Sequence, residues 1–291
     1  MMPLSIGDEV RAGTYRLHSR FRRAVNYTDG RRLVSVVGEE IGAGPLNIVV
    51  RRIPRRNSEI LEIDNDLLAE ARRFQSGLED GCTNSETLRL NLNTLQRVLV
   101  EESHPKSLAF LLDERRIRNF RSGFERAVAG QVCAGVSLLP SVAGVRQLAG
   151  LGFGLTPSGD DFIAGMLIAL NILGQPRRLI RTLGQAAMGD NDLSNAFLRL
   201  AREGRMTEKQ QELVSALLHR GRAEVKAAAR RVLAVGETSG ADWAVGFVMT
   251  AKSGVVECWS GGVMGRKKTP LFQHSNTPVL QRSLPRREIR P

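Results

Sequence analysis

Apolar and polar positions follow two different patterns along the chain, and the change of pattern separates a strand-rich start from a helix-rich remainder. Residues 32–37 and 46–53 are short runs rich in β-branched side chains. A glycine- and proline-containing stretch, residues 42–45, separates them, as is typical of a connection between strands. These features predict a small antiparallel β sheet or barrel within residues 1–56.

From residue 57 onward the apolar side chains recur at helical spacing. We therefore expect an α+β protein, in which a β-rich N-terminal domain (1–56) precedes a mainly helical domain over residues 57–265. Residues 266–291 are basic, contain four prolines and have little apolar periodicity, which predicts a disordered tail. The predicted helices are 59–73, 83–101, 113–129, 161–173, 179–187, 192–203, 208–235 with an interruption at Gly221, and 243–252.

The formal net charge of +12 is concentrated at the two ends of the chain. Residues 1–56 and residues 264–291 each carry a net charge of +6, and the segment between them is neutral. Solvated ends explain this distribution better than a polyanion-binding surface does. Aromatic residues make up only 5% of the chain, too few to favour a base-stacking surface. We therefore do not expect a nucleic-acid partner, although a regulator that uses its basic ends remains an alternative.

Nothing in the sequence predicts export, a membrane partner, a disulfide framework or a zinc site. The start MMPLSIGDEV lacks the basic and apolar regions of a signal peptide. The longest apolar stretch, residues 162–174, is too short to span a bilayer. The three cysteines are widely spaced, and no two histidines have the spacing of metal ligands. The expected location is the cytoplasm.

The strongest motif is the segment GLGFGLTPSGDDFIAG, residues 150–165. Its alternating glycines leave the backbone unshielded, and Thr156 is a candidate N-cap with Pro157 in the first helical turn. Free amides and the dipole at a helix N-terminus favour a small anion. Asp160 and Asp161 would repel a bare phosphate, and a magnesium ion or an amide-bearing substrate between them would resolve that conflict. The structural alternative is a helix cap with tight backbone packing.

A second copy of this motif favours function over capping alone. Residues 158–165 (SGDDFIAG) align without gaps with residues 239–246 (SGADWAVG), 81 positions later. We infer two pseudo-equivalent glycine-turn/helix units whose helix N-termini converge on one pocket, each contributing a hydroxyl, backbone amides and a carboxylate. The final glycine of each copy, Gly165 and Gly246, would allow the two helices to cross closely.

This hypothesis assigns a set of site residues. The candidate catalytic residues are Asp161 and Asp242. The candidate ligand-binding residues are Gly152, Gly154, Thr156, Ser158, Gly159, Asp160, Thr238, Ser239 and Gly240. No metal site is assigned, and Mg²⁺ is the one cofactor for which these residues give a reason.

The two SGxD motifs, together with the early segments RAVNYTDGRRLVSVV and GAGPLNIVV, resemble a bacterial family that includes the AllH-type subunit of oxamate carbamoyltransferase, from allantoin breakdown. The resemblance covers about residues 15–262. The chain departs from the family pattern at Glu237, where a histidine often precedes the second TSG.

The resemblance implies a subunit of an enzyme that exchanges oxalurate and phosphate for oxamate and carbamoyl phosphate. It also implies protein partners, including an acyl-CoA-synthetase-like subunit. Carbamoyl transfer passes through a crowded anionic transition state that fixed N–H donors and cations stabilise, which suits the site derived above. The alternative is a non-catalytic ligand-binding or scaffold subunit of a multi-subunit acyl- or carbamoyl-transfer complex.

Overall fold

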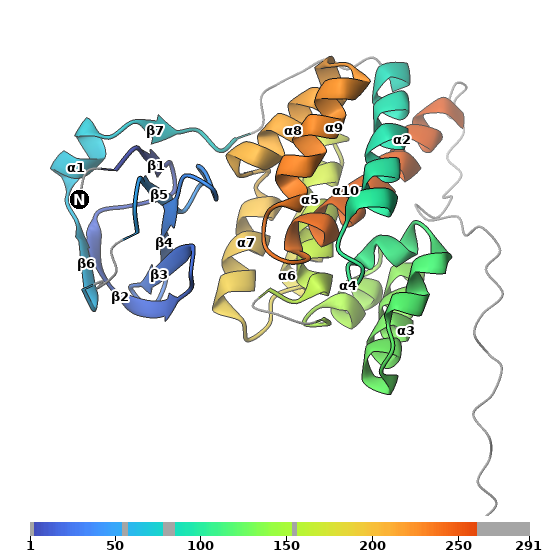
Figure 1. Cartoon of the computed structure of the whole chain (residues 1–291), viewed down its shortest axis with the longest axis horizontal. Coiled ribbons are helices and arrows are strands. Elements are labelled where there is room, and N and C mark those ends of the chain that lie inside the picture. The colour runs from blue at the N-terminus through green and yellow to red at the C-terminus, as the bar shows by residue number, and fades with distance from the viewer. Residues whose placement is uncertain (1–2, 54–57, 78–84, 153–155, 261–291) are drawn as a thin grey trace, which may run out of the picture.

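The computed structural model describes residues 3–53, 58–77, 85–152 and 156–260. A seven-stranded sheet lies at one end of the molecule and a helical domain at the other (Figure 1). This arrangement confirms the predicted α+β class, with a small β unit before a mainly helical one. The predicted basic tail and Gly154 lie outside the described residues.

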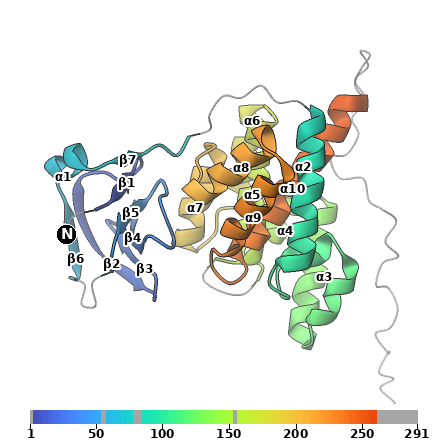
Figure 2. The same cartoon turned by 45° about the horizontal axis from the view of Figure 1, so that its top comes forward.

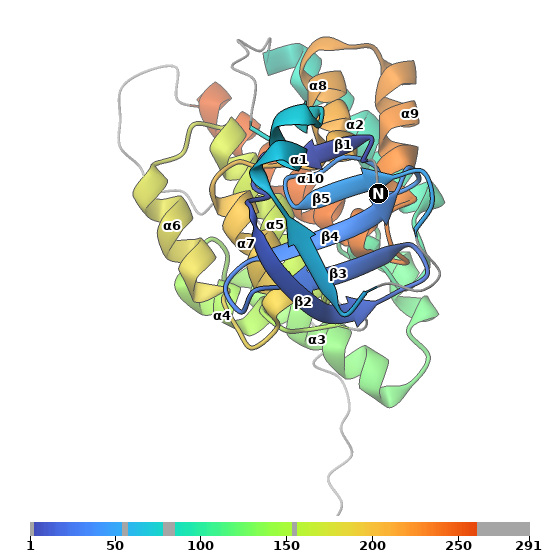
Figure 3. The ribbon, with the colours of Figure 1, turned by 90° about the vertical axis from the view of Figure 1, so that its left-hand side faces the viewer.

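The sheet is curled, and its strand order is β6-β2-β3-β4-β5-β1-β7 (Figure 3). Most neighbouring strands are antiparallel, as predicted, but the β4–β5 and β1–β7 pairs are parallel. One face packs around Tyr15, Val25 and Val36, which are buried. The strands are β1 (Ser5–Gly7), β2 (Gly13–Arg20), β3 (Ala24–Thr28), β4 (Leu33–Gly38), β5 (Asn47–Val50), β6 (Ile60–Ile63) and β7 (Arg73–Phe74).

The predicted helix 59–73 is wrong over its first and last residues. Residues 60–63 form β6, because the exposed edge of β2 offers their backbone a hydrogen-bonding partner. Helix α1 (Asn65–Glu70) follows, and the carboxylate of Asp64 caps it by accepting from the Leu67 amide at 2.7 Å. The sheet therefore continues to Phe74.

The predicted helix 113–129 is wrong at its start. Asp113 caps a short 3₁₀ helix, η2 (Glu114–Asn119), and the chain then turns before α3 (Gly123–Ser137) begins. Ser122 and Glu125 form a reciprocal capping box that fixes the start of α3. Local capping therefore divides one periodic stretch into two elements.

The remaining helical predictions correspond to helices of the structure, with shifted ends. These helices are α2 (Ser85–Glu102), α5 (Ser158–Ile172), α6 (Arg177–Ala186), α7 (Asp192–Arg202), α8 (Glu208–His219), α9 (Arg222–Leu233) and α10 (Ser239–Ser260). The structure also contains η1 (Leu108–Leu111) and α4 (Val142–Leu148), which the sequence patterns did not predict. Gly221, the predicted interruption, occupies the N-cap of α9. No helix in the described part of the chain is long and apolar enough to cross a membrane.

Helix α5 lies at the centre of the helical domain and packs along α10 (Figure 2). It is apolar on all sides, and Phe162, Ile163 and Met166 are completely buried. The loop before α8 contacts the sheet and so links the helical domain to it. There the Arg205 guanidinium contacts the carboxylates of Asp8 and Glu9, each at 2.9 Å.

Candidate functional site

The two SGxD turns lie side by side in the structure. The hydroxyl oxygens of Thr156, before α5, and Ser239, at the start of α10, are 2.9 Å apart. Both helices begin at this place and then cross one another, so their positive dipole ends are adjacent. The predicted meeting of the two helix N-termini is therefore confirmed; whether a ligand binds between them stays a prediction.

Equivalent glycines allow α5 and α10 to cross in backbone contact. A Cβ atom on Gly165 would lie 1.9 Å from the carbonyl oxygen of Trp243, and one on Gly246 would lie 2.0 Å from the carbonyl oxygen of Phe162. Gly165 corresponds to Gly246 in the repeat, and Phe162 corresponds to Trp243, so the two contacts are equivalent. The crossing therefore has an approximate two-fold symmetry that follows the sequence repeat.

The glycine that follows each serine serves packing in the same way in both copies. A Cβ atom on Gly159 would lie 2.0 Å from the Leu148 carbonyl oxygen, and one on Gly240 would lie 1.9 Å from the Val232 carbonyl oxygen. In each copy the helix start therefore presses against the end of the preceding helix, α4 or α9.

The amides of these two glycines already have acceptors within the protein. Gly159 donates to the carbonyl of Leu151 at 2.8 Å, and Gly240 donates to that of Val235 at 3.1 Å. The motif thus combines the capping geometry expected of the structural alternative with a convergent arrangement of hydroxyls and carboxylates.

The turn before α5 differs from the prediction in one respect. Pro157, not Thr156, occupies the N-cap position, and no side chain caps the helix. Gly152 has a φ of +124°, and a Cβ atom there would lie 2.5 Å from the Ser158 nitrogen. The turn therefore requires glycine at this position.

Thr156 contributes its hydroxyl to Asp161 instead of to the helix cap. Its Oγ1 donates to Oδ2 of Asp161 at 2.9 Å. Burial and the nearby charge of Asp242 raise the pKa of Asp161 well above its usual value, against the opposing hydrogen bonds of Thr156 and Ser239. Asp161 thus holds a proton more readily than an ordinary aspartate does.

Asp242 is completely buried. Its Oδ1 accepts a 2.6 Å hydrogen bond from the Leu108 amide, whereas Oδ2 accepts none from the described residues. Burial raises the pKa of Asp242 to about 6. The hydroxyls of Ser158 and Thr238 partly oppose this rise, but neither completes a hydrogen bond to Oδ2. An unpartnered buried carboxylate oxygen therefore lies beside the two turns.

Asp160 has a different environment from the other two aspartates. Its Oδ1 accepts from the Gly150 amide at 2.8 Å, and burial raises its pKa. The nearby Ser194 hydroxyl, at the start of α7, opposes that rise. The hydrogen bond of Asp160 with Gly150 holds the first turn in place. The second repeat has Ala241 at the equivalent position and therefore lacks this contact.

The structure adds a third segment that the sequence did not place at the site, residues 103–108, which run from the end of α2 to the start of η1. It supplies the Leu108 amide to Asp242 across 134 positions of sequence. It also brings Nε2 of His104 within 3.4 Å of Oε1 of Glu237, beside the second turn. No periodicity or motif connects this loop with the two turns, so sequence reasoning had no signal for it.

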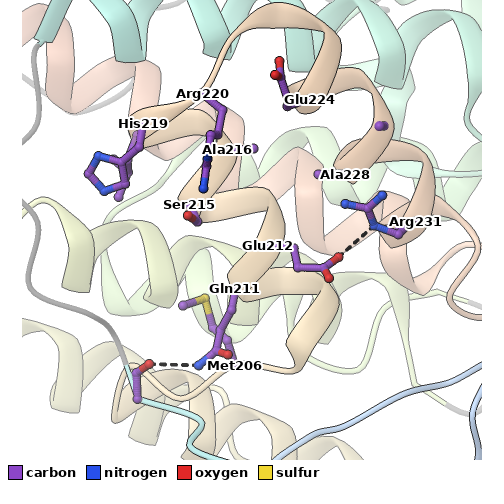
Figure 4. Close-up of a pocket in the computed structure, with 13 residues that line it drawn as sticks. Met206, Gln211, Glu212, Ser215, Ala216, His219, Arg220, Glu224, Ala228 and Arg231 are labelled. Carbon is purple, nitrogen blue, oxygen red and sulfur yellow. Dashed lines mark hydrogen bonds and ion pairs between the residues drawn. The ribbon is translucent and has the colours of Figure 1, made fainter.

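Neither a metal-ligand cluster nor a described pocket coincides with the paired turns. No group of three or more His, Cys, Asp or Glu side chains in the described ranges could hold a metal ion. One pocket, of about 510 Å³, lies between α8 and α9 (Figure 4). A second, of about 1030 Å³, is lined by α4, α6 and the ends of α5 and α7.

Comparison with known proteins locates the resemblance in the same part of the chain. No curated protein and no solved structure matches the sequence. A family model does match, and the matched residues include both SGxD turns and the crossing of α5 with α10. Residues 148–251 match the family of the oxamate carbamoyltransferase subunit AllH.

Proposed function

We propose that this chain is a subunit of an oxamate carbamoyltransferase-like enzyme and that it binds a small phosphorylated or carboxylated ligand at the paired SGxD turns. The observation that supports the proposal is the family match over residues 148–251, which contains both turns. The ligand class is that of carbamoyl phosphate and oxamate. The convergence of two helix N-termini supports the same placement.

The raised pKa of Asp161 weakens the main objection to an anionic ligand here. In the protonated form, which the raised pKa favours, Asp161 does not repel a phosphate or carboxylate, and its O–H can donate to one of the ligand's oxygens. Asp242, with a pKa of about 6, is mostly ionised at neutral pH and has one oxygen free to accept from a carbamoyl NH₂ group. The two aspartates then bind opposite ends of a carbamoyl-bearing ligand.

The hydroxyls of Thr156, Ser158, Thr238 and Ser239 complete the proposed site. They would hold the ligand's oxygens and keep it oriented, which lowers the entropic cost of transfer. The glycines Gly152, Gly159 and Gly240 contribute by allowing the backbones to approach. Catalysis then depends on a carbamoyl acceptor that binds here or is supplied by a partner subunit.

One observation favours the second candidate, a non-catalytic ligand-binding or scaffold subunit. The polar groups of the turns are largely bonded to one another: Thr156 to both Asp161 and Ser239, and Asp242 to the Leu108 amide. Such mutual bonding suits a rigid structural junction as well as a site. In that case the partner subunits carry the chemistry.

Titration calorimetry tests binding. The full chain is titrated with carbamoyl phosphate, oxamate and phosphate, with and without Mg²⁺. Asp161→Ala and Ser158→Ala should each weaken the binding at least about tenfold, because each removes a hydrogen bond to a charged ligand. Asp190→Ala, an exposed change outside the turns, should have no effect. Binding that is insensitive to Asp161→Ala, or absent altogether, contradicts the proposed site.

Phosphorolysis of oxalurate separates the two candidates. The reaction is assayed with the partner subunits in the presence of the wild-type chain, of Asp161→Ala, or of no added chain. Loss of turnover with a correctly assembled Asp161→Ala complex supports a catalytic site in this chain. Full turnover with that variant, but none without the chain, supports a scaffold. Full turnover in the absence of the chain contradicts both.

A further inference from the structure

The second pocket, at the opposite end of α5 from the SGxD turns, is lined by an unusual concentration of arginine. Its volume is about 1030 Å³. Its lining residues come from α4, α6 and the ends of α5 and α7. Its charged lining residues are Arg146, Arg177, Arg181, Arg202 and Glu203.

Most of this positive charge is not neutralised by the protein. Among the described residues, Arg146, Arg177 and Arg181 form no ion pair with a carboxylate. The carboxylate of Glu203 is shared between Arg202, at 3.8 Å, and Arg205, at 3.7 Å. The wall of the pocket therefore carries a net positive charge, borne largely by exposed arginines that no carboxylate of the described residues pairs with.

The pocket between α8 and α9 shows the contrast. There the guanidinium of Arg231 is bonded to the carboxylate of Glu212 at 2.7 Å (Figure 4). Glu224 and Arg220 also line that pocket, so its two acidic and two arginine side chains are equal in number. The pocket beside α6 has four arginines and one glutamate and carries an excess of positive charge.

The placement of arginines on α6 also costs stability in the absence of a ligand. Arg177 and Arg178 occupy the first turn, which contains no acidic residue, and no side chain caps the helix. Cations at a helix N-terminus oppose the helix dipole. A local rule broken in this way often marks a functional position.

One of the arginines is held in place before any ligand arrives. The aliphatic part of Arg202 packs against Gly184 of α6, where an added Cβ atom would lie 3.0 Å from its Cδ. Asn171 reinforces the position by donating to the Ala201 carbonyl at 3.1 Å, which ties the end of α7 to α5. Such preorganisation reduces the entropy lost on binding.

We propose that this pocket binds a small molecule that carries a chain of two or more phosphate groups. Guanidinium groups match phosphate oxygens in a bidentate geometry. Arginines from three helices around a volume of about 1030 Å³ are too many and too widely distributed for one orthophosphate. Thr182 and Gln185, on the same helix as Arg181, add neutral polar groups to the wall. The site is separate from the paired SGxD turns.

Calorimetry of the full chain with inorganic tripolyphosphate tests the proposal, with orthophosphate as the comparison. Arg181→Gln and Arg177→Gln should each weaken tripolyphosphate binding at least about tenfold, because each removes a charge-assisted contact. Arg178→Gln is the matched control, since Arg178 lies on the same helix but does not line the pocket. It should change the affinity less than about threefold.

Three results would overturn the proposal. Tripolyphosphate affinity that Arg181→Gln leaves unchanged would assign the binding to another basic part of the chain. An equal loss in Arg178→Gln would show that only overall charge matters. Tighter binding of a single-stranded oligonucleotide than of tripolyphosphate, with the same dependence on Arg181, would make the pocket part of a nucleic-acid surface.

Discussion

The hydroxyl of Thr156 lies 2.9 Å from that of Ser239, so two residues 83 positions apart join the starts of α5 and α10. Thr156 also donates to Asp161 at 2.9 Å. Either hydroxyl of the Thr156–Ser239 contact can act as the donor. A chain of hydrogen bonds thus runs from the second turn to the carboxyl group of the first.

This chain predicts energetic coupling between the two turns. Thr156→Val and Ser239→Ala should each destabilise the protein, and their effects should be non-additive by about 0.5–1.5 kcal/mol. Urea unfolding of the two single variants and the double variant measures the coupling. The control cycle pairs Thr156→Val with Ser137→Ala, whose exposed hydroxyl bonds only within α3. Additivity in the first cycle would show that the contact between the turns carries no energy.

The crossing of α5 and α10 predicts a strong dependence on glycine. Gly165→Ala would place a methyl group 1.9 Å from the Trp243 carbonyl oxygen, so the helices must separate, at a cost of about 1–3 kcal/mol or more. Gly130→Ala, in α3, meets nothing within 4 Å and should stabilise its helix by up to about 1 kcal/mol. Thermal melting of the two variants checks the contrast; similar melting temperatures would be incompatible with the observed crossing.

Sequence patterns predict the fold where local signals and tertiary contacts agree. The two-part division, the apolar α5 and the break at Gly221 all follow from periodicity and glycine placement. Residues 60–63 show the limit. Their apolar spacing suits a helix, but pairing with β2 decides their conformation, and no local window contains that information.

The same distinction applies to the candidate site. The repeated SGxD motif is enough to predict that α5 and α10 meet, because both copies carry the glycines that a close crossing needs. It cannot predict the Leu108 amide that binds Asp242, since a backbone donor has no signature in the side-chain sequence. Nor does it reveal that Asp160 bonds to Gly150 within its own turn.

Arg116 is predicted to control the pKa of Asp242 through the loop that precedes Leu108. Its guanidinium donates to the carbonyls of Ser103 and His104, at 2.9 and 2.8 Å. Arg116→Lys cannot reproduce this fork, so the loop and its amide donor should loosen. Because the Leu108 hydrogen bond lowers the pKa of Asp242, that pKa should rise above about 6.

Carboxyl NMR titration measures this shift. Arg118→Lys serves as the control, because Arg118 lies in the same 3₁₀ helix but is exposed. It should leave the titration of Asp242 unchanged. An unaltered pKa in Arg116→Lys would show that the loop keeps its position without the guanidinium.

The buried carboxyl of Asp242 predicts that stability falls as the pH rises. Its pKa is about 6 in the folded protein, above the ordinary 3.8, so the folded state holds the proton more tightly than the unfolded state does. This group therefore imposes no penalty below about pH 4, and a growing one as the pH rises through 6. The full penalty is about 3 kcal/mol, of which about half appears between pH 5 and pH 7.

Asp242→Asn should remove that dependence, because an amide keeps an oxygen for the Leu108 amide and has no charge to bury. Loss of the Asp242 charge should also lower the pKa of Asp161, since that charge helps to raise it. Urea unfolding of wild type, Asp242→Asn and Asp190→Asn between pH 5 and pH 8 measures both effects. The exposed Asp190→Asn variant should follow the wild type, while Asp242→Asn should gain stability above pH 6. If Asp242→Asn instead loses stability equally at every pH, the pH dependence persists without the carboxyl group, and ionisation of Asp242 is not its source.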